Sequence, residues 1–167
     1  MTFLKAAEIL CKKDSKYRFI MANDGSLRSK IEAFIEEKNL NEKITLIGKQ
    51  YGVDNINFYN SIDIYVSTSL RDGGLAGSIG EAMSSQRLTI VSNNSDNPLF
   101  IEDGVTGYLF NNKDYNKLAY LISTSSSEIE KSREIARHGR NIINSKYNSE
   151  LQMQKVNNCY QEVFDNY

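Results

Sequence analysis

The amino-acid sequence predicts an α/β protein with a doubly wound, mostly parallel sheet followed by C-terminal helices. Segments of strand composition alternate with segments whose apolar residues recur at helical spacing, which is typical of this class. Residues 88–91 form a short apolar run, as expected for a strand buried on both faces of a parallel sheet. The 167 residues suffice for one ordinary domain, so we expect residues 1–167 to form a single unit.

The expected strands are clusters of β-branched and aromatic residues that end at turn signals. They are residues 17–22, 44–47, 62–67, 88–91 and 108–110. The first strand ends at Asn23, Asp24 and Gly25, and Gly104 and Gly107 frame the turn before the last one.

The expected helices combine an apolar stripe with capping residues. They are residues 2–13, 27–35, a short segment at Phe58 and Tyr59, 79–84, a turn beginning at Pro98, and three helices after Asp114. Ser26 and Asn97 are the expected N-caps of the second helix and of the Pro98 turn. In a doubly wound sheet, ligands bind beyond the carboxyl ends of the strands. The loops after Ala22, Ile47, Ser67 and Val91 should therefore share one rim.

Composition excludes several functional classes. Twenty Lys and Arg residues against 21 Asp and Glu give a formal charge of -1, without the positive excess that nucleic-acid binding needs. There is neither an apolar run of bilayer length nor a signal-like start, so we expect a cytoplasmic protein. Cys11 and Cys159 lie far apart and His138 is the only histidine, so we expect neither a disulfide framework nor a metal site.

The segment from Ser69 to Met83 is the most informative for chemistry. Gly73, Gly74 and Gly77 let the backbone approach a ligand, and the start of the following helix offers amides that suit a diphosphate. The spacing matches neither a P-loop nor the dinucleotide-binding fingerprint. A tight turn without a ligand is the alternative.

Glu81 lies one turn into that helix and could accept hydrogen bonds from sugar hydroxyls. The alternative is a capping box, in which Glu81 accepts from the amide of Ser78. Asp72 is either a second site carboxylate or an exposed loop residue.

Five segments in register resemble a known enzyme family. They are residues 44–48, 58–69, 72–83, 88–92 and 101–110, supported upstream by residues 19–27. Together they resemble the C-terminal half of retaining glycosyltransferases of family 4, which have the two-domain GT-B architecture. The resemblance implies a Rossmann-like domain that binds a nucleoside diphosphate sugar, such as a UDP- or GDP-hexose, without a metal.

The resemblance also implies roles for individual residues. Glu81 corresponds to the second acid of a Glu-x7-Glu motif and would hold the ribose hydroxyls, with Asp72 as its catalytic partner near the transferred hexose. The remaining implied donor contacts are Gly48 and Lys49 beside the base and Gly73, Gly74, Leu75, Ala76, Gly77 and Ser78 near the diphosphate.

Two departures from the family pattern bear on function. The first acid would fall at Gly73, so we align Asp72, one residue earlier, in a longer loop. The chain starts within the helix that follows the family's first strand, and that strand, its Arg and Lys pair and the N-terminal acceptor domain are missing. Arg71 or Lys49 could substitute in part or be ordinary surface cations. We therefore expect the isolated chain to turn over no donor.

Two functional hypotheses follow. The first is the donor-binding domain of a hexosyltransferase that uses a glycan or lipid-linked acceptor, held through the missing domain. The second is a non-catalytic binding or partner subunit that kept the fold. The basic stretch at residues 131–140 allows peripheral membrane contact, with a solvated helix face as the alternative.

Overall fold

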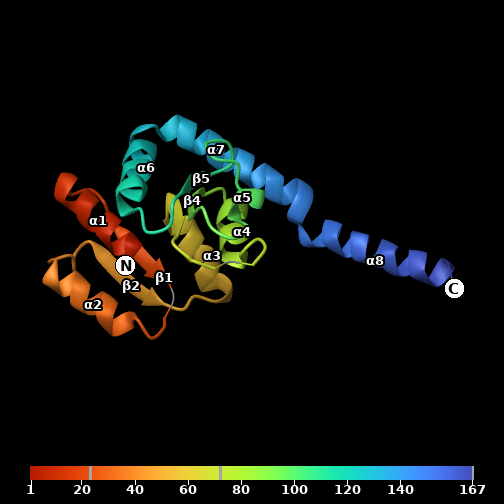
Figure 1. Cartoon of the computed structure of the whole chain (residues 1–167), viewed down its shortest axis with the longest axis horizontal. Coiled ribbons are helices and arrows are strands. Elements are labelled where there is room, and N and C mark those ends of the chain that lie inside the picture. Colours follow the sequence, from red (N-terminus) through yellow and green to blue (C-terminus); the bar gives the residue numbers. More distant parts are fainter. Residues whose placement is uncertain (23, 72, 167) are drawn as a thin grey trace.

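The computed structural model describes residues 1–22, 24–71 and 73–166 and confirms the α/β fold class. Strands and helices alternate through the first two thirds, and helices alone follow (Figure 1). The strands are β1 (Phe19–Ala22), β2 (Ile44–Gly48), β3 (Ile64–Ser67), β4 (Leu88–Ser92) and β5 (Tyr108–Phe110). The helices are α1 (Thr2–Lys13), α2 (Arg28–Glu37), α3 (Gly52–Ser61), α4 (Gly77–Ser84), α5 (Asn97–Phe100), α6 (Tyr115–Ser127), α7 (Ile129–Ile142), the π-helical turn η1 (Ile143–Tyr147) and α8 (Ser149–Asp165).

All strand pairs are parallel, as predicted, but they form two sheets. Strand β1 pairs with β2, with Phe19 opposite Ile44. Strand β4 lies between β3 and β5, with Ile90 opposite both Val66 and Tyr108. Within the residues described, no ladder joins β1 to β3, so the doubly wound sheet is divided at its centre.

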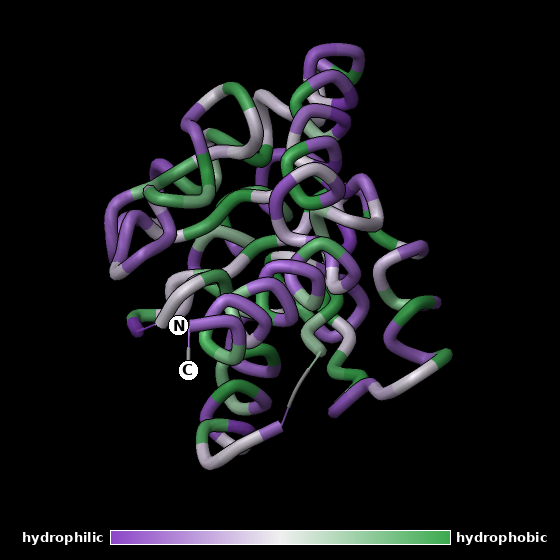
Figure 2. Tube along the Cα trace, turned by 90° about the vertical axis from the view of Figure 1, so that its right-hand side faces the viewer, coloured by the Kyte–Doolittle hydropathy of each residue, from purple (hydrophilic) through white to green (hydrophobic). Residues whose placement is uncertain are grey.

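The apolar core lies on both faces of strand β4. Leu88 and Ile90 pack with α1 and α6 in one apolar cluster, whereas Val91 packs with α4 and η1 in the other. Side chains of a strand alternate between the two faces of its sheet, which explains this division. Hydrophobic and hydrophilic residues accordingly mix along the covering helices (Figure 2).

Two helix starts differ from the predicted caps. Helix α2 begins after Leu27, not Ser26, without a side-chain cap. Helix α5 begins after Asp96, so Asn97 is the first helical residue; it is buried and donates from Nδ2 to the carbonyl oxygen of Ser92 at 3.0 Å. The buried amide satisfies the backbone of β4 in place of capping the helix.

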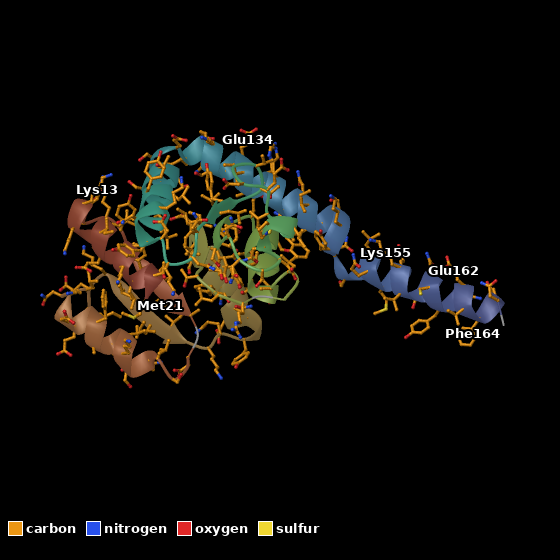
Figure 3. All side chains as sticks on the ribbon, in the orientation of Figure 1. Lys13, Met21, Glu134, Lys155, Glu162 and Phe164 are labelled. Carbon is orange, nitrogen blue, oxygen red and sulfur yellow. The ribbon has the colours of Figure 1, made fainter. Side chains whose placement is uncertain are left out.

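Helix α8 projects from the rest of the molecule and none of its described residues is buried (Figure 1). Tyr160 is 63% exposed. Phe164 is exposed near the outer end (Figure 3). Tyr147 instead contacts the ring of Phe100, with centroids 5.5 Å apart, while Tyr167 lies outside the described residues. No helix in the described ranges is both long and apolar enough to cross a bilayer.

Candidate functional site

A groove of about 1250 Å³ runs between β1 and β3, and we call it the central groove. The two strands form its sides, and Phe3, Phe58 and Ile122 contribute apolar surface from the flanking helices. Lys49, Ser78 and Glu81 line it as well. The groove therefore connects the gap between the half-sheets with the predicted ligand site.

Glu81 is held by two donors from helix α3. The phenol of Tyr59 donates to Oε2 at 2.9 Å, and Nδ2 of Asn55 donates to the same oxygen at 3.2 Å. Glu81 remains exposed, so the carboxylate is oriented yet accessible from the groove. The alternative of a capping box is wrong, because α4 begins after Ala76 without a side-chain cap and Ser78 is its second residue.

Tyr59 is the buried part of this arrangement, with 4% of its surface exposed. Its hydroxyl also approaches the carbonyl oxygen of Ser78, at 3.2 Å. Burial raises the pKa of the phenol, and the hydrogen bond to Glu81 raises it further. The hydroxyl therefore stays protonated and keeps donating to the carboxylate at neutral pH.

The amino end of α4 presents backbone donors beside Glu81. Within the helix, the first amides to reach a carbonyl are those of Ile79 and Gly80, which donate to Ala76 at 2.9 and 3.1 Å. The preceding amides of Gly77 and Ser78 have no acceptor inside the helix, and both residues are exposed. Such a helix start is suited to an anion.

The glycine-rich loop is tied to the loop after β4. The amide of Gly74 donates to Oδ2 of Asp96 at 2.7 Å, and Gly74 has a φ of +66°, which favours glycine. A carboxylate already occupies one of the amides that we expected to face a diphosphate. The Gly74 amide therefore already donates to an anionic group of the same chain.

A second set of contacts fixes the base of the glycine-rich loop. The hydroxyl of Ser92 donates to the carbonyl oxygen of Ser69 at 2.5 Å, and Nδ2 of Asn94 reaches the same oxygen at 3.4 Å. Ser92 is buried at the end of β4. The loops after β3 and β4 are therefore held together at the shared rim.

The predicted site residues divide into two groups. The first group lines the groove and comprises Lys49, Ser78 and Glu81. Gly48, with a φ of +69°, turns the chain at the end of β2, and Lys49 follows it at an exposed position. The second group precedes or begins α4 beyond the groove lining and comprises Gly73, Gly74, Leu75, Ala76 and Gly77. The side chains of Leu75 and Ala76 pack toward the core, so only their backbone can serve a ligand. Asp72 lies outside the described residues.

Sequence reasoning missed Tyr59, Asn55 and Asp96 as site residues. Tyr59 and Asn55 are separated from Glu81 by 22 and 26 positions, and Asp96 from Gly74 by 22. Only the tertiary fold brings these pairs together, and no local motif marks them. In the described part of the chain, no group of three or more His, Cys, Asp or Glu side chains is placed to hold a metal ion.

Known proteins are similar to this chain in sequence and in fold. The sequence pattern of the family described as Glycosyl transferases group 1 matches residues 1–142. A poly(ribitol-phosphate) alpha-N-acetylglucosaminyltransferase of Staphylococcus aureus is 32% identical over 159 residues, covering 94% of this chain. The chain spans only about a third of that relative, 31% of its length.

Solved structures agree with the sequence match. The crystal structure of a TarM mutant from S. aureus, in complex with fondaparinux, alpha-GlcNAc-glycerol and UDP, has a TM-score of 0.82 and 31% identity; the match covers 94% of this chain and 31% of that one. The C-terminal domain of a glycosyl transferase group 1 family protein (LpcC) from Francisella tularensis has a TM-score of 0.78 and 23% identity, over 89% of this chain and 78% of that one. With a family match over most of its length, this chain belongs to the group 1 glycosyl transferases.

Proposed function

We propose that this chain is the donor-binding domain of a retaining glycosyltransferase that transfers a hexose from a nucleoside diphosphate sugar to a glycan or lipid-linked acceptor. The observation that carries the proposal is the accessible carboxylate of Glu81, oriented by Tyr59 and Asn55 beside the amino end of α4. UDP in the similar S. aureus structure supports the choice of a nucleotide ligand.

The carboxylate suits a pair of vicinal hydroxyls. Tyr59 and Asn55 both donate to Oε2, so they fix the plane of the carboxylate. The remaining lone pairs of an ionised carboxylate can accept from hydroxyl groups. Hydrogen bonds to a charged acceptor contribute about 1.5–3 kcal/mol each, enough to make Glu81 a principal contact of the ribose.

The amino end of α4 suits the diphosphate. The amides of Gly77 and Ser78 are adjacent to Glu81 in the same helix, and the helix dipole favours negative charge there. In this proposal the diphosphate also takes the Gly74 amide, which Asp96 now occupies. The ribose and diphosphate of one ligand would thus be bound by consecutive parts of one loop and helix.

These groups would act mainly by positioning. Backbone amides aimed at the leaving diphosphate stabilise the charge that develops as the sugar bond breaks, without a metal. Orientation of donor and acceptor supplies the rest of the rate enhancement. Because the chain spans a third of its S. aureus relative, we assign the acceptor site to a further domain, which would precede this one.

Calorimetric titration of this chain with UDP, GDP and ADP tests the proposal. We expect at least one nucleotide to bind, and Glu81→Gln to weaken that binding by about tenfold to a hundredfold, the equivalent of losing charged hydrogen bonds. Glu134→Gln, on the exposed face of α7 (Figure 3), is the matched control and should bind normally. Absence of binding by all three nucleotides, or equal affinity of the Glu81 variant, would contradict the proposal.

A further inference from the structure

Helix α8 has an apolar face that the described residues leave uncovered. Four exposed side chains form it and follow one another at intervals of three, four and three residues: Met153, Val156, Tyr160 and Val163. This is the spacing of the core positions of a helix that packs lengthwise against another helix. The face therefore matches a helical partner, and it belongs to the element that projects from the rest of the molecule (Figure 1).

The charged side chains of α8 lie away from this face. Lys155 and Glu162 point to one side of the helix, and Phe164 points to the other (Figure 3). Four positions flank the apolar residues, and none of them carries a charge: Gln152, Asn157, Cys159 and Phe164. Charges at these flanking positions normally set the choice of partner. Without them, two identical faces can approach each other free of repulsion between like charges.

The charge of α8 argues against a lipid surface as the occupant of this face. The helix carries one cation, Lys155, against three carboxylates, those of Glu150, Glu162 and Asp165. Helices that lie on membranes are rich in Lys and Arg on their polar face. The negative potential of an anionic membrane attracts such cations and repels an acidic helix. A protein helix is therefore the better match.

The apolar positions are symmetric about the middle of the helix, at Asn158. Met153 and Val163 lie five residues on either side of Asn158, and Val156 and Tyr160 lie two residues on either side. When two copies pack antiparallel about this centre, Met153 meets Val163 of the second copy, and Val156 meets Tyr160. Each valine then faces a longer side chain, so the facing positions alternate in size as in a packed core. The face is complementary to itself.

The charges on the outer side of α8 also favour the antiparallel arrangement. With Asn158 at the centre, Lys155 of one copy lies within one residue of the level of Glu162 of the second copy. In a parallel pair, Lys155 would lie level with Lys155 and Glu162 with Glu162. Opposite charges at one level attract and like charges repel, so the charges select the antiparallel pair.

We propose that α8 is a self-association surface, through which two copies of this chain form an antiparallel helix pair with the four apolar residues of each copy in the seam. Because α8 projects, the two bodies lie at opposite ends of the pair and do not obstruct it (Figure 1). A helix of 17 residues is about 25 Å long, and one such pair buries less than about 1,200 Å². We therefore expect a transient dimer, with a dissociation constant of about 10–500 µM.

Sedimentation equilibrium of the 167-residue chain, without nucleotide, tests this inference independently of the proposed function. Between about 10 µM and about 1 mM, we expect the mean mass to rise from that of one chain toward that of two. Tyr160→Glu places a charge in the seam twice in every dimer, so the dissociation constant should rise at least about tenfold. Gln154→Glu adds the same charge on the polar face and should associate like the wild type. Both positions are exposed, so both variants should fold.

Chemical cross-linking tests the direction of the pair. Cys159 is exposed and lies one residue from the centre, so the two Cys159 thiols lie on the same side of the seam in the antiparallel dimer. In a parallel pair they would lie on opposite sides. A short bismaleimide should therefore link two wild-type chains, and Cys159→Ser should remove the product.

Three results would overturn the inference. The first is a chain that stays monomeric up to about 1 mM. The second is a dimer that Tyr160→Glu leaves as stable as Gln154→Glu does, because another surface would then hold the two copies together. The third is a dimer that the bismaleimide does not link through Cys159, because the helices would then not be antiparallel about Asn158.

Discussion

Strand β4 and the strands β1 and β3, which flank the central groove, are similarly apolar but differ in burial. All five residues of β4 are buried, whereas three of the four residues of β1 and all four of β3 are only partly buried. Strand β4 has a paired strand on each side, while β1 and β3 are each paired on one side among the described strands. The difference shows that the number of strand neighbours, as well as composition, determines how much apolar surface a strand buries.

The same division separates the site into two contributions. The β3–β4–β5 half provides Glu81, the amino end of α4 and the Asp96 contact, and the β1–β2 half provides Lys49 at the rim. Helix α3, which connects the halves, carries Tyr59 and Asn55. The connection between the half-sheets therefore also orients the carboxylate.

The largest expected effect tests the difference in burial directly. Ile90→Ala in β4 removes a side chain with 0% exposure, so we expect the free energy of unfolding to fall by about 2–5 kcal/mol. Ile20→Ala in β1 removes a partly buried side chain and should cost less than about 1.5 kcal/mol. Urea denaturation measures the free energy of unfolding of both variants. Equal losses of stability would contradict the difference in burial between β4 and β1.

A smaller effect is expected from Tyr59, a residue of the helix α3 that connects the two halves. Tyr59→Phe removes the hydroxyl that donates to Glu81, so it should lower the free energy of unfolding by about 1 kcal/mol and weaken UDP binding about threefold to tenfold. Calorimetry with UDP and urea denaturation measure the two effects. Tyr120→Phe, at an exposed position on α6, should change neither. Unchanged UDP affinity in Tyr59→Phe would mean that Glu81 needs no orientation by α3.

Removing the contact between the loops after β3 and β4 should change UDP affinity less than Tyr59→Phe does, and in the opposite direction. Asp96→Asn removes the negative charge that lies against the Gly74 amide. We therefore expect UDP to bind about twofold to fivefold more tightly, most clearly at low salt. Asp165→Asn, at the exposed end of α8, is the control for the change in net charge. Weaker UDP binding by the Asp96 variant would show that this carboxylate organises the loop and does not compete with the ligand.

The smallest expected effect is a pH dependence. The pKa of Tyr59 is raised in the folded protein, so the folded state retains a proton that the unfolded state loses above about pH 10. The stabilisation that Tyr59 contributes is present below about pH 10, and it is lost as the pH rises through the raised pKa of Tyr59 in the folded protein. The difference in unfolding free energy between the wild type and Tyr59→Phe should therefore shrink above pH 10. A constant difference up to pH 11 would contradict this account.

Sequence patterns predicted the elements better than their contacts. Strand β4 and helix α1 were expected close to where they lie, because an uninterrupted apolar run and an apolar stripe are local signals. Helix α3 is longer than the short segment expected at Phe58 and Tyr59, since exposed Val53 and Ile56 blur its periodicity.

The site itself was only partly predictable. Glu81 and the start of α4 were identified as candidates from the glycine-rich segment. The capping box considered as an alternative is wrong, because the helix begins at Gly77. The donors to Glu81 come from another helix, and such tertiary pairs leave no mark on local sequence. The division of the sheet depends on strand neighbours and was likewise not visible in composition.

The central claim is that Glu81 and the amino end of α4 bind a nucleoside diphosphate, and nuclear magnetic resonance tests it most directly. With UDP added to the isotope-labelled chain, the account predicts that the largest amide shifts occur at Gly77 and Ser78 and at the side-chain amide of Asn55. Shifts at these groups no larger than those at Gly139 in α7 would contradict it.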